Sequence, residues 1–225
     1  GTTEEQLVEI AVATRKWAQL NPQATRKEDM TIDDVMASMP IADPLKLFDC
    51  CLVTDGAGAV VVTTAENAKA VGRKPAYVRG FGEAHTHWSI GAMPDLARLT
   101  AAEMSGRTAF EMAGVSHDAI DLVECYDSFT ITVLLTLEAL GFAERGAGGE
   151  FVSNQRTAPG GDFPLNTNGG GLSYCHPGMY GIFLLIEAVR QMRGEAGERQ
   201  VEGVETALVH GTGGTLSSGA TVILA

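Results

Sequence analysis

The sequence Asn166-Thr-Asn-Gly-Gly-Gly-Leu-Ser-Tyr-Cys-His-Pro-Gly-Met-Tyr-Gly181 places three glycines and one histidine directly ahead of an apolar run. Consecutive glycines release the backbone from steric limits and let it approach a ligand closely. Proline is favoured in the first turn of a helix, so we expect a helix over residues 177–193 with His176 at its N-terminus. The helix dipole would keep that histidine neutral, as a base or a hydrogen-bond donor requires. We therefore predict an active-site loop here.

On both sides of this loop the sequence alternates between strand and helix patterns, which predicts a layered α/β fold. The β-branched run at 57–63 lacks alternation, which is typical of a strand buried on both faces. The helix expected over 94–113 offers a core face made of Leu96, Leu99, Met104, Ala109 and Met112. We expect strands at 57–63, 76–83, 120–125, 205–210 and 220–224, and helices from the Thr3–Gln6 capping box to Pro22, through Val35 and Met36, and at 65–71, 94–113, 128–140 and 177–193.

Composition and charge limit the partners of the protein. Its 225 residues, 45% of them hydrophobic, can bury one sizeable core, and a formal net charge of -12 would repel nucleic acid. The apolar stretches at 131–140 and 182–189 are shorter than the roughly 20 residues of a membrane span. Four cysteines without a C-x-x-C pair favour a reducing compartment, so we expect a cytoplasmic protein. His85 and His87 lack a third ligand nearby in sequence, so no metal site is expected.

A second candidate loop, Glu124-Cys-Tyr-Asp-Ser-Phe129, lies where a strand gives way to a helix. Strand ends commonly line ligand sites in α/β sheets. The phenol of Tyr126 can donate a hydrogen bond to an oxyanion or, if its pKa is perturbed, exchange a proton. The alternative interpretation is a structural tyrosine next to a helix cap formed by Asp127 or Ser128.

A third glycine-rich stretch follows the strand that ends at His210. Its free backbone amides could form an oxyanion hole, or the stretch could be a plain glycine hairpin between the last two strands, with His210 at its edge. No phosphate-binding G-x-x-x-x-G-K-S/T loop, G-x-S-x-G elbow or G-x-G-x-x-G motif is present, so the usual nucleotide and serine-hydrolase interpretations are excluded.

Taken together, the order and spacing of these three loops resemble the C-terminal half of the thiolase superfamily, especially its sterol-carrier-type and lipid-transfer-protein-like members. Residues 166–177 follow the family's asparagine, glycine-glycine and glycine-histidine-proline motif, with Cys175 where glycine is usual. Residues 55–62 resemble the aspartate-glycine-alanine strand near the end of the N-terminal half. The resemblance implies an αβαβα layered fold with a complete C-terminal and a truncated N-terminal half. The implied divisions are a partial loop region at 1–50, the end of the N-terminal half at 51–84 and the C-terminal domain at 85–225.

The resemblance also implies roles for individual residues. His176 matches the histidine that helps activate the family's cysteine and holds a thioester oxygen, and His210 stands near the cysteine of ordinary thiolases. Where sterol-carrier-type thiolases have His-Asp-Cys-Phe, this chain has Tyr126-Asp127-Ser128-Phe129. The catalytic residues expected on this basis are Tyr126, His176 and His210. The expected substrate-binding residues are Asp127, Ser128, Asn168, Tyr174, Gly213 and Gly214.

Loss of the usual histidine and thiol argues against simple Claisen thiolysis, which needs a thiolate and a second acid or base. The pattern is similar to thiolase-like aldolases of steroid side-chain breakdown, which cleave a β-hydroxyacyl-CoA and often pair with an OB-fold partner. We expect Tyr126 to act as the base and His176 to stabilise the enolate, with Tyr174 as the reserve base. Acyl transfer is the other enzymatic interpretation, and a nucleophilic cysteine upstream in the sequence would favour it.

A non-catalytic lipid or acyl-CoA binding subunit is the alternative from a different functional class. In either case the expected partners are an acyl-CoA and a second copy of the chain, and no cofactor is implied beyond the CoA thioester itself.

Overall fold

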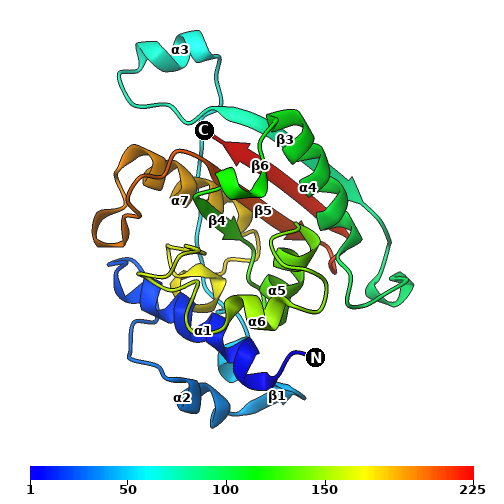
Figure 1. Ribbon diagram of the computed structural model, residues 1–225. Helices are drawn as coiled ribbons and strands as arrows, with labels where there is room; N and C mark the ends of the chain where they lie inside the picture. The colour runs from blue at the N-terminus through cyan, green and yellow to red at the C-terminus, as the bar shows by residue number, and fades with distance from the viewer.

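A four-stranded mixed sheet forms the centre of the computed structural model, which describes residues 1–225 (Figure 1). The strand order is β3-β6-β5-β4. β6 pairs antiparallel with both β3 and β5, while β4 pairs parallel with β5 and aligns Cys125 with His210. The strands are β3 (Val78–His85), β4 (Leu122–Cys125), β5 (Ala207–Gly213) and β6 (Ser218–Leu224). The mixed α/β fold expected from the sequence is confirmed.

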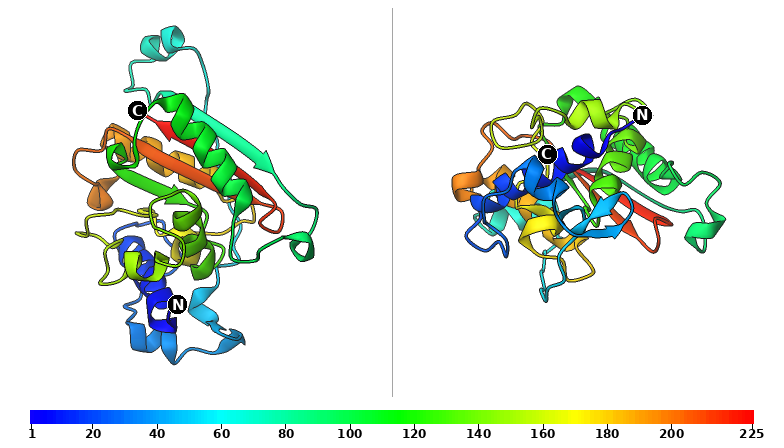
Figure 2. Two further views of the ribbon diagram at one scale, coloured as in Figure 1. Left: turned by 45° about the vertical axis from the view of Figure 1, so that its right-hand side comes forward. Right: turned by 90° about the horizontal axis from the view of Figure 1, so that it is seen from below.

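Helices cover both faces of this sheet (Figure 2). α4 (Thr100–Ala113) packs on β3 and β6, and α7 (Gly181–Arg193) packs on β5 and β4 from the opposite side. One apolar cluster joins α1 (Glu4–Gln19) and α5 (Thr130–Ala139) to the α4 side of the sheet, and a second joins α7 to its other side. Each face of the central strands is therefore buried.

α1 begins with the expected capping box, in which Thr3 and Gln6 bond each other's backbone amides.

Short elements complete the fold. The remaining helices are α2 (Ile32–Met36), α3 (Ala65–Ala70) and α6 (Gly148–Val152), and β1 (Pro40–Ala42) pairs with β2 (Leu45–Lys46). One-turn helices lie at Leu47–Asp49, Ile90–Ala92, His117–Ala119, Gly170–Tyr174 and Gly197–Arg199.

The core face of α4 differs from the expected one. The helix starts at Thr100 rather than residue 94, and Leu96, Met104 and Met112 are exposed, while Leu99 and Ala109 are buried. Its buried face consists of small residues because the helix lies directly on glycines of the sheet. A Cβ added to Gly80 would lie 2.2 Å from the Ala109 carbonyl oxygen, and one added to Gly82 would lie 2.3 Å from that of Ser105. The buried residues of α4 are Ala101, Ala102, Ser105, Gly106, Ala109 and Ala113.

The strand expected at 57–63 is absent, and this prediction was wrong. The segment is extended but unpaired, and Val61 and Val62 are 92% and 84% exposed. A β-branched run becomes a strand only when a neighbouring strand satisfies its backbone groups, and no strand of this chain lies beside it. The segment instead runs along α7, where Gly58 lies against Ile182 and Ile186.

Two further observations concern the expected divisions and classes of site. β3 crosses the expected division between residues 84 and 85 and pairs with β6, so it belongs to the same sheet as the later strands. No helix is both long enough and apolar enough to cross a membrane, and no group of three or more histidine, cysteine, aspartate or glutamate side chains is arranged to hold a metal ion.

Candidate active site

Tyr126 and His176 form the centre of the candidate site. The Tyr126 hydroxyl lies 2.6 Å from Nε2 of His176, and the two rings stack with centroids 5.4 Å apart and planes 22° apart. Both side chains are half-buried. The two loops that the sequence indicated separately, 50 residues apart, thus meet in one hydrogen-bonded pair.

The ends of two elements hold this pair in place. Tyr126 directly follows β4, and its amide donates to the carbonyl of His210 on β5 at 3.0 Å. The amide of His176 donates to Oγ1 of Thr54 at 2.8 Å. His176 does not stand at the start of a helix as expected, because residues 177–180 form a turn and α7 begins at Gly181.

Burial keeps both members of the pair neutral. It lowers the pKa of His176 below 6.5, offset partly by nearby backbone groups, so the neutral imidazole expected from a helix dipole is present for a different reason. Burial also raises the pKa of Tyr126 above 10, with further contributions from Cys51 and Asp127. In the tautomer that carries its proton on Nδ1, Nε2 accepts from the neutral phenol, and the tyrosine oxygen keeps lone pairs for a substrate proton.

The carboxylate of Asp127 holds the glycine loop rather than facing an open cavity. Its Oδ1 accepts from the amide of Gly171 at 2.6 Å and its Oδ2 from that of Leu172 at 3.1 Å. Asp127 is fully buried, which raises its pKa to about 7 against the opposing effect of these amides. Gly170 has a φ of +61°, and a Cβ there would lie 2.0 Å from Asp127 Oδ2. Only glycine fits, which explains this part of the sequence.

Asn168 is likewise turned toward the loop. It is 2% exposed, and its Oδ1 accepts from the amide of Gly170 and from the hydroxyl of Tyr180, both at 2.8 Å. The Tyr180 ring lies 6.3 Å from that of His176 and 6.1 Å from that of Tyr126, measured between centroids. In this structure Asn168 therefore holds Tyr180, whose ring lies near the Tyr126–His176 pair. The expected contact of Asn168 with substrate stays a prediction.

Ser128 and Tyr174 lie at the margins of the site. Ser128 Oγ pairs with Thr132 Oγ1 at 3.0 Å, and the N-cap of α5 is Phe129, which makes no side-chain cap. The alternative in which Asp127 or Ser128 caps this helix is therefore wrong. The Tyr174 ring packs edge-on against Phe183, with centroids 6.0 Å apart.

The His210 carbonyl accepts from the Tyr126 amide, but the imidazole of His210 bonds to other residues than the Tyr126–His176 pair. Its Nδ1 pairs with Thr221 Oγ1 at 2.8 Å, and Thr221 in turn pairs with Ser105 of α4, on the side of the sheet opposite α7. His210 is fully buried, which lowers its pKa to about 4. Gly213 ends β5 and Gly214 opens the turn to β6 with a φ of +60°, so the stretch is the glycine hairpin of the alternative interpretation. The catalytic and oxyanion roles of these residues stay predictions.

The residues missed from the sequence are those of segment 51–54. The amide of Cys51 donates to the Ser128 carbonyl at 3.0 Å, and that of Leu52 donates to the Gly171 carbonyl at 2.9 Å. Burial and nearby Asp127 raise the pKa of the Cys51 thiol to about 11, so it is not an activated nucleophile here. Extended backbone that bonds to distant loops leaves no pattern in the sequence.

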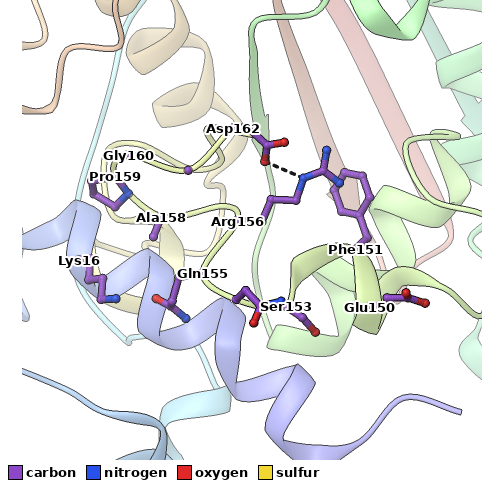
Figure 3. A pocket seen from close by; sticks show the side chains of 12 residues that line it. Lys16, Glu150, Phe151, Ser153, Gln155, Arg156, Ala158, Pro159, Gly160 and Asp162 are labelled. Atoms are coloured by element: carbon purple, nitrogen blue, oxygen red, sulfur yellow. Dashed lines mark hydrogen bonds and ion pairs between the residues drawn. The ribbon is translucent and has the colours of Figure 1, made fainter.

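A surface hollow of about 590 Å³ lies elsewhere, between α1 and the segment 150–162, which begins in α6. Figure 3 shows its one arginine, Arg156, stacked over the Phe151 ring and paired with Asp162 at 2.8 Å. The guanidinium of Arg156 is thus already paired with the carboxylate of Asp162. None of the predicted site residues lines this hollow, so the candidate site is the Tyr126–His176 pair.

Known proteins share this architecture. Residues 82–225 match the family described as thiolase C-terminal domain-like. The solved "Ltp2-ChsH2(DUF35) aldolase" superposes with a TM-score of 0.88 at 28% identity, over 100% of this chain and 59% of that one.

Curated relatives match almost the whole chain. An acetyl-CoA acetyltransferase of Methanothermobacter thermautotrophicus is 41% identical over 96% of this chain and 56% of its own length. The 17-hydroxy-3-oxo-4-pregnene-20-carboxyl-CoA lyase of Mycobacterium tuberculosis is 35% identical over 97% of this chain and 57% of its own length. The chain thus spans a little over half of each relative. The resemblance seen in the sequence is confirmed, and the chain belongs to the thiolase C-terminal domain-like family.

Proposed function

We propose that this chain provides the catalytic pair of an enzyme that cleaves a carbon–carbon bond of a β-hydroxyacyl-CoA by a retro-aldol reaction. The observation that carries the proposal is the 2.6 Å contact between the Tyr126 hydroxyl and Nε2 of His176. A phenol bonded to a neutral imidazole can accept a substrate proton while passing its own proton on. The aldolase and the lyase among the similar proteins support the same class of reaction.

The proposed step starts with the substrate's β-hydroxyl proton moving to the Tyr126 oxygen as the tyrosine proton moves to His176. The bond between the α and β carbons then breaks, its electron pair forms the thioester enolate, and the β carbon leaves as a carbonyl. The imidazolium formed on His176 lies beside the enolate and stabilises its charge. Return of the proton through Tyr126 to the α carbon completes the acyl-CoA product.

Acyl transfer is a second candidate because the acetyltransferase relative is 41% identical. That reaction needs a nucleophilic thiolate, whereas the thiols of Cys51 and Cys175 both have pKa values raised to about 11, chiefly by burial. The retro-aldol reaction needs no such group within this chain. We therefore favour it.

The proposed partners follow from the resemblance to thiolase-like aldolases. They are an acyl-CoA substrate, a second copy of the chain and a DUF35-type protein of the kind named for the Ltp2 structure, in which we expect an OB fold. A cytoplasmic location also belongs to this proposal.

The test compares Tyr126→Phe with wild type in the full-length protein together with any partner that co-purifies. The substrate is the CoA ester named for the mycobacterial lyase, and release of the ketone product is followed. We expect turnover to fall at least about 1000-fold with CoA-ester binding retained, because the proton acceptor is lost. Tyr77→Phe is the matched control, because this exposed tyrosine lies outside the site, and it should keep activity. Unchanged turnover in Tyr126→Phe, or acetyl transfer to CoA as the only activity, would refute the proposal.

A further inference from the structure

A buried polar network lies behind the candidate site and plays no part in the step above. It joins Glu124 of β4 to Glu187 and Gln191 of α7 through Thr167 of the glycine-loop motif. Glu124 and Thr167 are 0% exposed, and Glu187 and Gln191 are 1% exposed. Buried carboxyl groups of this kind need compensating partners.

Glu187 has the partner of an ionised carboxylate. Arg199 donates from Nε to Oε1 at 2.8 Å and from Nη2 to Oε2 at 2.9 Å, which is the paired geometry that guanidinium and carboxylate favour. Arg199 is 6% exposed, so this ion pair is withdrawn from solvent. Glu187 is therefore the charged member of the network.

Glu124 has no cation beside it. Its Oε1 accepts from the amide of Thr167 at 3.0 Å, whereas its buried Oε2 has no hydrogen-bond partner. An ionised carboxylate would leave a buried negative charge with one oxygen unsatisfied.

The number of hydrogen bonds that the Thr167 hydroxyl can donate shows which carboxyl group carries a proton. This hydroxyl oxygen lies 2.8 Å from Oε1 of Glu124, 2.9 Å from Oε1 of Glu187 and 2.9 Å from Nε2 of Gln191. A hydroxyl carries one hydrogen, so it can donate to only one of the two carboxyl oxygens. The other oxygen must carry a proton of its own. The charged Glu187 accepts from Arg199, so Glu124 is the member that donates.

We propose that Glu124 is a neutral, proton-carrying acid that positions the active-site loop against β4. The proton on its Oε1 bonds Thr167, and Thr167 bonds Glu187, which Arg199 holds in turn. Glu124 lies on β4, two residues before Tyr126, and Thr167 lies between the two asparagines of the loop that ends at His176. The network therefore fixes the spacing of the two halves of the catalytic pair. This role rests on the proposed function, but the protonation itself does not.

The charges around Glu124 agree with this assignment. Burial raises its pKa well above 4.5 and Glu187 and Asp127 raise it further, while the bond donated by the Thr167 amide opposes them only in part. Cys125 and Tyr180 are the other titratable groups beside it, and both are neutral because burial raises the pKa values of their side chains. Arg199 is the one cation of the network, and Glu187 occupies it.

The first test detects the proton directly by infrared spectroscopy of ¹³C-glutamate-labelled protein at about pH 8.5, where glutamates of ordinary pKa are ionised. We expect the C=O stretch of one protonated glutamic acid in wild type and in Thr167→Ser, and its loss in Glu124→Gln. Unfolding curves check that each variant is folded. The absence of this band in wild type, or its persistence in Glu124→Gln, would overturn the proposal.

The second test measures positioning. A glutamine cannot both accept from the Thr167 amide and donate to the Thr167 hydroxyl with one atom. We therefore expect kcat to fall about 10-fold in Glu124→Gln and in Thr167→Val with KM nearly unchanged, and to recover in Thr167→Ser. If wild type lacks turnover, the proposed function fails, and the proton NMR signal of the Tyr126–His176 hydrogen bond replaces kcat as the readout. A signal or kcat unchanged in Glu124→Gln would rule out the positioning role.

Discussion

Oδ1 of Asp127 lies 2.6 Å from the amide nitrogen of Gly171, and the carboxyl group that makes this bond is fully buried. Burial raises the pKa of Asp127 from 3.8 to about 7, so the folded protein holds this proton more tightly than the unfolded chain does. The favourable contribution is complete below about pH 4 and is lost as pH rises toward 7, up to about 4 kcal/mol.

We therefore predict that Asp127→Asn, which cannot ionise, loses less stability than wild type between about pH 4 and pH 7. The unfolding free energy of the variant minus that of wild type, measured in urea at pH values across this range, should increase as pH rises. Parallel pH profiles would contradict the raised pKa.

The pH dependence of catalysis should reflect His176. Burial lowers its pKa below 6.5, and the proposed step needs the neutral ring. Activity should therefore rise with pH to a plateau, with the midpoint of the acidic limb of kcat/KM below pH 6.5. His176→Asn should lower kcat/KM at all pH values and remove this limb. A midpoint above 6.5 would contradict the proposed neutral acceptor.

The contact of α4 with the sheet makes Gly82 sensitive to a single methyl group. In Gly82→Ala the new Cβ would lie 2.3 Å from the carbonyl oxygen of Ser105, so the helix must move. We expect a loss of about 2–3 kcal/mol in unfolding free energy, measured by chemical denaturation. Gly91→Ala is the control, because its nearest neighbouring atom is 4.0 Å away, and it should change stability by less than about 0.5 kcal/mol.

His210 should limit stability in acid. Its folded-state pKa of about 4 lies below the ordinary 6.5, so its contribution is complete above 6.5 and is lost as pH falls toward 4. The loss amounts to about 3 kcal/mol. In His210→Gln this component disappears, so the stability gap between wild type and variant should narrow as the solution is acidified. Turnover of the same variant near that of wild type would remove His210 from the catalytic residues.

The sequence was sufficient where local chemistry determines structure. The Thr3–Gln6 capping box and the strand–helix alternation are local patterns, and both are present in the structure. The meeting of the loops at Tyr126 and His176 was anticipated through the resemblance to the thiolase superfamily, in which these loops line one site.

Other features depend on contacts between distant segments. The core face of α4 is set by Gly80 and Gly82 beneath it, so the large residues Met104 and Met112 point outward despite their helical spacing. The role of Leu52 depends on a backbone bond to Gly171, which no side-chain pattern reveals. Glu124 looks like an ordinary strand residue until Thr167 and Glu187 are placed beside it.

The extended segment at 57–63 also affects the tendency of the protein to self-associate. Val61 and Val62 are almost fully exposed, and their backbone amides and carbonyls have no strand partner in this chain. Apolar β-branched residues on an unpaired extended segment are a template for pairing between molecules, and hence for aggregation. Residues 1–225 expressed alone should therefore self-associate as concentration rises. Val61→Lys should reduce this association, seen by light scattering, because a charged side chain opposes pairing between copies.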